Sequence, residues 1–165
     1  MNTTTQTPAK SSPNIKIREA LSDRDYHRAY PLILQLLPYL DMGTYTSRAF
    51  VARATGYRLF VAEIGTDVVG VIGLVPNYNI HDGFVMYIEH IVVDEKYRGQ
   101  GFGSMLLDFA EKRTIEEGCT LIQLDTDEGT ETHRIYERHG YVKTGSYYEK
   151  TLKRPRGPLL SGKKQ

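Results

Sequence analysis

Tyr97-Arg-Gly-Gln-Gly-Phe-Gly-Ser104 has glycine at three alternate positions, between a strand-like and a helix-like stretch. A β-branched apolar run at 84–93 precedes it, and a helical pattern at 105–117 follows. Glycine accepts positive φ angles and lets a ligand approach the main chain closely. The unpaired N–H groups of the first helical turn then point toward that ligand, with the positive end of the helix dipole behind them. The stretch therefore predicts an anion cradle that suits a pyrophosphate.

Outward from this loop, the hydrophobic pattern predicts the order β-α-α-β-β-β-α-β-α-β-β, which is an α/β (α+β) fold. Strands are expected at 15–18, 58–64, 68–75, 84–93, 120–124, 141–145 and 147–152, and helices at 22–37, 44–54, 105–117 and 132–139. The crossover from 84–93 through the glycine loop to 120–124 makes those two strands parallel and close in the sheet. Ligands favour the carboxyl ends of such strands, where the loop and Asp125 both lie.

Length and composition narrow the class of protein. The chain has 165 residues, which suits one domain, and its formal net charge of +1 does not indicate nucleic-acid or membrane-surface binding. A single cysteine, Cys119, excludes an internal disulfide and suits a reducing compartment, so we expect a cytoplasmic protein. No apolar run approaches the roughly 18–20 residues that a membrane span needs. We expect flexible tails at 1–14 and, with basic character, at 153–165, around a domain at 15–152.

Two common phosphate loops do not fit the glycine stretch. A P-loop needs a lysine directly after its last glycine, and none follows here. A dinucleotide fingerprint needs its third glycine one place later, and a second βαβ half is missing. What fits is the pattern R/Q-x-x-G-x-G/A, filled by Arg98, Gly101 and Gly103 between a strand and a helix.

At these residues the chain resembles the GCN5-related N-acetyltransferase (GNAT) superfamily, over 15–152. Three motifs in order carry the resemblance: 88–104, 121–126 and His133-Arg-Ile-Tyr-Glu-Arg-His-Gly-Tyr141. It implies a mixed, mostly antiparallel sheet of six to seven strands, flanked by about four helices, with one splayed parallel pair. It also implies transfer of an acetyl group from acetyl-CoA to a primary amine in a ternary complex without a metal. The acceptor is then a small-molecule or a protein or peptide amine, and a homodimer stays open.

The resemblance also assigns the residues that would bind acetyl-CoA. The pantetheine arm would follow the backbone of the strand end, and the pyrophosphate would lie on the glycine loop. Relatives often carry an asparagine before the last helix, and Thr132 or a main-chain group would replace it here. The implied cofactor residues are Ile91, Val92, Val93, Arg98, Gly99, Gln100, Gly101, Phe102, Gly103, Ser104 and Thr132.

Two residues are candidates for proton transfer. Tyr136 matches the tyrosine commonly proposed as the general acid of the family, which would protonate the leaving thiolate. Glu89 lies where several relatives place a catalytic glutamate, and a carboxylate there suits a base that deprotonates the acceptor ammonium. If the strand alternates, His90 faces the opposite side of the sheet. It is then interpreted as structural.

The acceptor side has weaker signals. Asp125 ends the parallel strand, and the family takes its acceptor specificity from the first two helices, where Tyr39 and Tyr45 are candidates. Asp127, Glu128 and Glu131 add acidic character that favours a cationic acceptor or is simply a solvated loop. Two alternatives to an acetyltransferase stay open, a non-catalytic acyl-CoA-binding module and a transferase for a longer acyl group. The presence of both Glu89 and Tyr136 favours the enzyme.

Overall fold

A computed structural model describes residues 15–127, 132–146, 148 and 150 of the chain, as five strands, four α-helices and one short 3-10 turn. The elements are β1 (Ile15–Glu19), α1 (Asp23–Leu36), α2 (Met42–Ala54), β2 (Arg58–Ile64), β3 (Asp67–Asn79), β4 (Gly83–Val93), the 3-10 turn η1 (Glu95–Tyr97), α3 (Phe102–Glu116), β5 (Leu121–Leu124) and α4 (Thr132–Arg138). Among these described residues no helix is both long enough and apolar enough to cross a bilayer.

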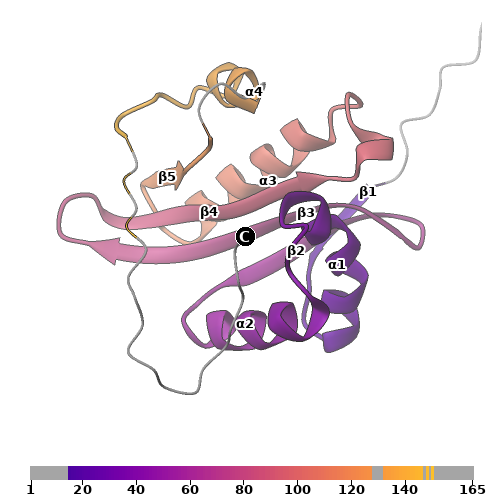
Figure 1. The fold of residues 1–165 in the computed structure, drawn as a ribbon. Helices are drawn as coiled ribbons and strands as arrows, with labels where there is room; N and C mark the ends of the chain where they lie inside the picture. The colour runs from indigo at the N-terminus through magenta and orange to yellow at the C-terminus, as the bar shows by residue number, and fades with distance from the viewer. Residues whose placement is uncertain (1–14, 128–131, 147, 149, 151–165) are drawn as a thin grey trace, which may run out of the picture.

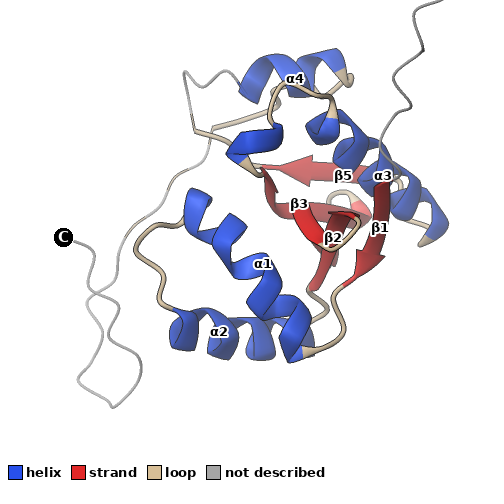
Figure 2. Ribbon diagram, turned by 90° about the vertical axis from the view of Figure 1, so that its right-hand side faces the viewer, coloured by secondary structure: helices blue, strands red, loops and turns tan. Residues whose placement is uncertain are grey.

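The five strands form one sheet in the order β1-β2-β3-β4-β5 (Figure 1). The first three pairs are antiparallel, and β4 and β5 pair in parallel, as the crossover through α3 requires. Figure 2 shows α1 and α2 on one face of the sheet and α3 on the other. The predicted α/β fold with one parallel pair is thus confirmed.

Each face of the sheet has its own apolar core. On the α1/α2 face, Leu59, Val61 and Val71 pack under the helices. On the α3 face, Ile72, Leu74, Met86, Leu106 and Leu107 are almost completely buried. Strand residues alternate between the two faces, as a sheet covered on both sides demands. β4 is the fourth of the five strands and is covered on both faces, so the end that extends beyond β5 is a rigid platform for a site.

One of the predicted strands needs correction. Residues 141–146 form neither strand nor helix, so the closing strand expected at 141–145 is absent, and the described sheet has five strands rather than six to seven. The strand expected at 147–152 and the two expected tails fall largely or wholly outside the described residues. Val142 and the residues that follow it to 146 are exposed, so their β-branched pattern alone does not secure a strand.

Local signals set the bounds of the first two helices. The Ser22 hydroxyl accepts from the Asp25 N–H, and the Asp25 carboxylate accepts from the Ser22 N–H, which is a complete capping box. Asp41 caps α2 through the Thr44 N–H at 2.9 Å, so α2 begins two residues before the sequence predicts. Each of the two helices therefore begins at a residue that its own sequence specifies, and α1 packs against β3 and β4.

Candidate functional site

The parallel strands separate at the carboxyl end of β5. Pairing ends where Ile88 lies opposite Leu124, whereas β4 continues to Val93. Residues 125–127 form no strand, so the β5-side edge of β4 has no strand partner over 89–93 within the described part of the chain. This open edge presents main-chain donors and acceptors to a ligand.

The register decides which main-chain groups of β4 face the open edge. The Asp94 N–H donates to the Val69 carbonyl at 3.0 Å, so hydrogen-bonded and non-bonded pairs alternate backward from there. Val92 then exchanges its hydrogen bonds with Val71, while the N–H and C=O groups of Ile91 and Val93 point away from β3. Of the three strand residues predicted to bind acetyl-CoA, Ile91 and Val93 are the two whose main-chain groups face the open edge.

The glycine loop has the backbone that the sequence predicts for a cradle. Gly99 and Gly101 have φ angles of 73° and 89°, and no atom lies within 4 Å of where a Cβ would stand on either residue. Gly101 is the N-cap of α3 and forms no side-chain cap, so the first-turn N–H groups have no intrahelical acceptor. The Phe102 ring is buried under this turn and anchors it in the core. The loop therefore offers main-chain donors and the dipole of a 15-residue helix to an anion.

The side chain of Arg98 is held within the protein. Its Nε donates to the Val93 carbonyl at 3.1 Å, and its Nη2 donates to the Gln35 Oε1 at 3.2 Å. Gln35 comes from the last turn of α1, and no motif in the sequence pointed to it. A second loop residue, Gln100, donates from its amide to the Lys96 carbonyl at 3.3 Å. Side chains thus brace the loop, and its main chain is left for the ligand.

A β-bulge in β4 changes the predicted orientation of His90. Gly73 pairs with His90 and Leu74 pairs with Ile88, which leaves Glu89 as the extra residue on β4. Ile88 and Ile91 both face the α3 core, so the two residues between them turn toward the α1/α2 face. The expectation that His90 lies opposite Glu89 is therefore wrong, because it assumed unbroken alternation. Glu89 is exposed there, next to His90.

Tyr57 and His90 form a hydrogen-bonded pair beneath this bulge. The Tyr57 hydroxyl and His90 Nε2 are 3.1 Å apart, and the tautomer decides which of them donates. Burial lowers the pKa of His90 to about 4, so the imidazole is neutral at pH 7. A Cβ on Gly73 would stand 2.6 Å from His90 Cε1 and 2.7 Å from Tyr57 Cε2. Glycine at position 73 is thus what lets both rings pack here.

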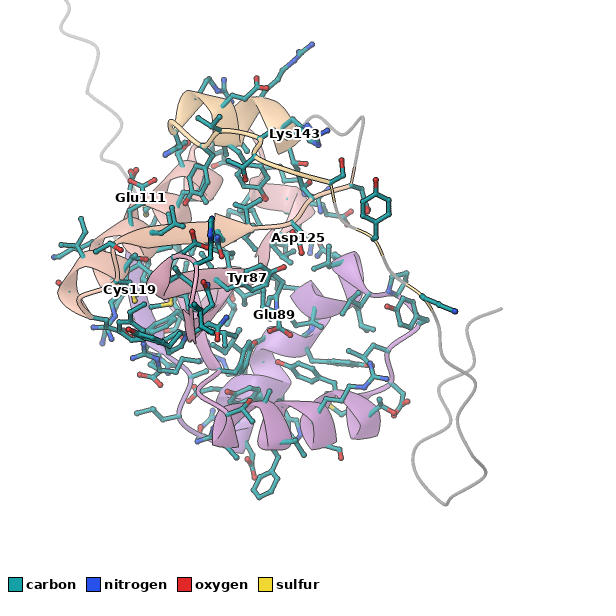
Figure 3. All side chains as sticks on the ribbon, turned by 90° about the vertical axis from the view of Figure 1, so that its left-hand side faces the viewer. Tyr87, Glu89, Glu111, Cys119, Asp125 and Lys143 are labelled. Carbon is teal, nitrogen blue, oxygen red and sulfur yellow. The ribbon has the colours of Figure 1, made fainter. Side chains whose placement is uncertain are left out.

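Asp125 forms a hydrogen bond with Tyr87, a residue that no sequence motif indicated. The Tyr87 hydroxyl donates to Asp125 Oδ2 at 2.6 Å, joining β4 to the end of β5. Figure 3 shows Tyr87, Glu89 and Asp125 gathered on one side of the sheet. Tyr87 precedes Glu89 by two residues and alternates with Met86 and Ile88, so it belongs to the α1/α2 face. Two carboxylates therefore stand at the open end of the parallel pair.

Tyr136 lies on α4, which packs against the start of α3. Ile135 Cδ1 is 3.1 Å from where a Cβ would stand on Gly103, so α4 closes directly on the glycine loop. The Tyr136 ring packs at the edge of the α3 core, 5.9 Å from the Tyr141 ring centroid, and burial raises its pKa. A raised pKa keeps the phenol protonated at neutral pH, as a proton donor requires. Thr132 opens the same helix, and its hydroxyl lies 3.2 Å from that of Thr126.

The two predicted acceptor tyrosines differ. Tyr39 is 61% exposed between α1 and α2, where a ligand can reach it. Tyr45 is only 6% exposed and stacks on Tyr30 with ring centroids 5.5 Å apart, so it belongs to the α1/α2 core and not to the acceptor surface. Glu128 and Glu131 lie outside the described residues.

Comparison with known proteins gives one family. A model of the acetyltransferase (GNAT) family matches residues 20–141, which include β4, the glycine loop and α4. The chain is 27% identical over 141 residues to the uncharacterized N-acetyltransferase YhdJ of Bacillus subtilis, covering 84% of this chain and 99% of that protein. It is 31% identical over 147 residues to the aminoalkylphosphonate N-acetyltransferase of Salmonella typhimurium, covering 85% and 93%.

A solved structure agrees with these sequence matches. The crystal structure of an acetyltransferase of Trypanosoma brucei superposes with a TM-score of 0.70 at 25% identity. The match covers 84% of this chain and 100% of that one. The similarity therefore extends over the sheet and both helical layers, and not only over the glycine loop.

Proposed function

Because the chain belongs to the acetyltransferase (GNAT) family, we propose that it acetylates the primary amine of a small cationic molecule by direct transfer. Family membership makes the protein an acetyl-CoA-dependent N-acetyltransferase. The finer proposal rests on the open end of β4, which has the glycine loop on one side and two carboxylates on the other. We assign the catalytic domain to residues 15–152.

The donor is proposed to bind along the outward main chain of β4. Ile91 offers its N–H and C=O groups and Val93 offers its N–H group to an extended pantetheine amide chain, while the Val93 carbonyl accepts from Arg98 Nε. The loop from Arg98 to Ser104 offers its N–H groups to the pyrophosphate, where positive φ at Gly99 and Gly101 opens the main chain. The acetyl thioester then lies near the bulge at Glu89.

The proposed chemistry uses one side chain from each face of the sheet, Glu89 and Tyr136. The free amine attacks the thioester carbonyl carbon, a C–N bond forms and the C–S bond breaks. Glu89, on the α1/α2 face, is proposed to take the proton of the ammonium directly or through water. Tyr136, at the edge of the α3 core, is proposed to give its proton to the leaving thiolate. The acid and the base thus act from opposite faces of the sheet.

Charge supports a cationic acceptor. Glu89 and Asp125 place two carboxylates at the acceptor side, and Tyr87 fixes the orientation of the second. Opposite charge within about 4–6 Å favours the ammonium form, so these groups would bind and orient an amine before the base removes its proton. The Salmonella relative is named for an aminoalkylphosphonate, whose anionic group these carboxylates would disfavour. The prediction is therefore preference for polyamines or amino sugars.

A thiol-release assay with acetyl-CoA and a panel of amines tests the proposal. The panel holds a polyamine, an aminoglycoside, an aminoalkylphosphonate and a lysine peptide, and we expect the highest kcat/KM for one of the first two. An aminoalkylphosphonate as the best substrate would contradict the charge argument, and a lysine peptide as the best substrate would contradict the assignment of a small-molecule acceptor. Binding of acetyl-CoA without turnover on any amine would favour a non-catalytic acyl-CoA-binding module. Turnover only with a longer acyl-CoA would favour a transferase for a longer acyl group.

Gly101 supplies the control for the donor site. Gly101→Ala and Gly101→Asp both strain a φ of 89°, but only aspartate adds a negative charge where the pyrophosphate would lie. We expect Gly101→Asp to abolish CoA binding in calorimetry and Gly101→Ala to weaken it less. If both variants bound CoA as tightly as the unsubstituted protein, this loop would not be the pyrophosphate site.

A further inference from the structure

Gln35 connects the acceptor-side helix α1 to the cofactor loop. Its Oε1 accepts from the Glu95 N–H at 3.1 Å and from Arg98 Nη2 at 3.2 Å. Arg98 in turn donates from Nε to the Val93 carbonyl at 3.1 Å. One amide oxygen therefore fixes both the turn that follows β4 and the arginine that precedes the glycines. These contacts use two of the five N–H groups of the guanidinium, so it keeps donors for a further acceptor.

The type of side chain at position 35 is as important as its contacts. Asp94 and Glu95 balance Lys96 and Arg98, so the segment that leads into the glycines has no formal net charge. A neutral amide holds Arg98 without cancelling its charge. A carboxylate at the same place would pair with the guanidinium and give the segment a net negative charge, beside the position proposed for a doubly charged pyrophosphate.

We propose that Gln35 is a positioning residue that holds Arg98 through a neutral acceptor and so keeps its positive charge available to the acetyl-CoA pyrophosphate. The proposal rests on the cofactor site proposed above. It gives α1 a second role besides bordering the acceptor, because the last turn of that helix also sets the geometry and the electrostatic potential of the donor loop. In this proposal, an arginine that donates to Val93 and Gln35 adds its charge to the main-chain donors of the loop.

Gln35→Glu tests the charge, because glutamate retains an oxygen for both donors and adds one negative charge. We expect the Kd of CoA, measured by calorimetry at about 0.1 M salt, where the Debye length is about 10 Å, to rise roughly 3–10-fold, with the difference shrinking as added salt screens the charge. The thermal midpoint should stay at or above that of the unsubstituted protein, since the glutamate gains an ion pair with Arg98. Gln35→Met removes the one oxygen that accepts both hydrogen bonds, and its loss of affinity should depend little on salt.

Lys112→Gln is the matched control. It changes net charge by the same amount on α3, ten residues from Phe102 and so roughly 15 Å along the helix, beyond a Debye length. Its Kd should stay within twofold. If Gly101→Asp abolishes binding while Gln35→Glu binds CoA as tightly as the unsubstituted protein, the inference about Gln35 is overturned and the cofactor site stands. If Gly101→Asp also has no effect, the cofactor site itself is overturned.

Discussion

At the scale of single residues, Tyr136 is the clearest case in which position and environment point to one role. Its ring packs at the edge of the α3 core, and burial raises its pKa, so the phenol holds its proton until a stronger base forms beside it. We predict that Tyr136→Phe lowers kcat about 10²–10⁴-fold, because a proton transfer is lost. Its thermal midpoint should change little, since the ring remains. Steady-state kinetics and a melting curve measure both quantities.

Tyr141→Phe is the matched control for Tyr136→Phe. The Tyr141 ring lies 5.9 Å from that of Tyr136, and its hydroxyl is buried without a hydrogen-bond partner among the described residues. Removing that oxygen should leave kcat unchanged and stabilise the fold slightly, because an unsatisfied polar atom disappears. Equal activity of the two variants would leave Tyr136 with a packing role only.

Single residues also show which parts of the candidate site could be predicted from the sequence and which could not. The motif at 133–141 gave the position of Tyr136, and the glycine pattern gave the loop, because both depend on local spacing. Tyr45 was misassigned because an aromatic in the segment that borders the acceptor can turn either way, and here it stacks on Tyr30 in the core. Gln35 and Tyr87 had no signal, since each acts through a partner 38 or more residues away.

At the scale of elements, the β4 bulge decides which side chains turn toward the α1/α2 face, where we propose that the acceptor binds. Gly73 on β3 makes room for the rings of His90 and Tyr57. We predict that Gly73→Ala, whose Cβ would stand 2.6 Å from His90 Cε1, costs about 1–3 kcal/mol of unfolding free energy. It should also lower kcat/KM, because a displaced His90 moves Glu89. Urea unfolding and steady-state kinetics are the measurements.

A glycine in open surroundings separates this effect from the general effect of adding a methyl group. A Cβ on Gly145 would meet no atom within 4 Å, so Gly145→Ala should change neither stability nor rate. If Gly73→Ala were as stable and as active as Gly145→Ala, the rings would have room to spare and the bulge would not depend on the glycine.

The helices and hairpins were predictable where the residues that set their ends are close together in the sequence. Caps and turns fixed the helices and hairpins to within a few residues, as at Ser22 and Asp41. The bulge was not predictable, because Gly73, Tyr57 and His90 lie on three different strands or strand ends and only the sheet brings them together. The strand expected at 141–145 failed for the same reason, since a strand needs a partner that its own residues do not specify.

At the scale of the whole molecule, a sheet with helices on both faces puts the proposed donor and acceptor sites on opposite sides of the end of β4. The proposed donor site lies with α3, α4 and the glycine loop, and α1 and α2 lie on the side of the carboxylates (Figures 2 and 3). The arrangement requires that α1 and the first strands stay in place against the sheet. A network of ion pairs holds them there, because Arg18 on β1 contacts Asp25 on α1 and Glu63 on β2, and Arg28 on α1 also contacts Glu63.

This network predicts an acid-sensitive component of stability. Hydrogen bonds from Arg18 lower the pKa of both Asp25 and Glu63 below their usual values. A depressed folded-state pKa stabilises the fold above the unfolded pKa, near 4, and the contribution is lost as the pH falls through the folded-state value. We predict that Glu63→Gln, whose carboxylate is only 11% exposed, costs about 3 kcal/mol at pH 7. The difference should shrink below about pH 4, as urea unfolding at pH 7 and pH 3.5 would show.

Glu116→Gln distinguishes the network from surface charge in general. Glu116 pairs with Lys112 and Arg113 on α3, but its side chain is 46% exposed, so its removal should cost no more than about 1 kcal/mol. Because Glu63 joins β2 to both Arg18 and Arg28, its loss should also loosen α1, and with it the Gln35 contacts to the cofactor loop. Glu63→Gln should therefore weaken CoA binding while Glu116→Gln does not. A Glu63→Gln protein that loses stability at pH 7 but binds CoA normally would show that α1 is anchored independently at its two ends.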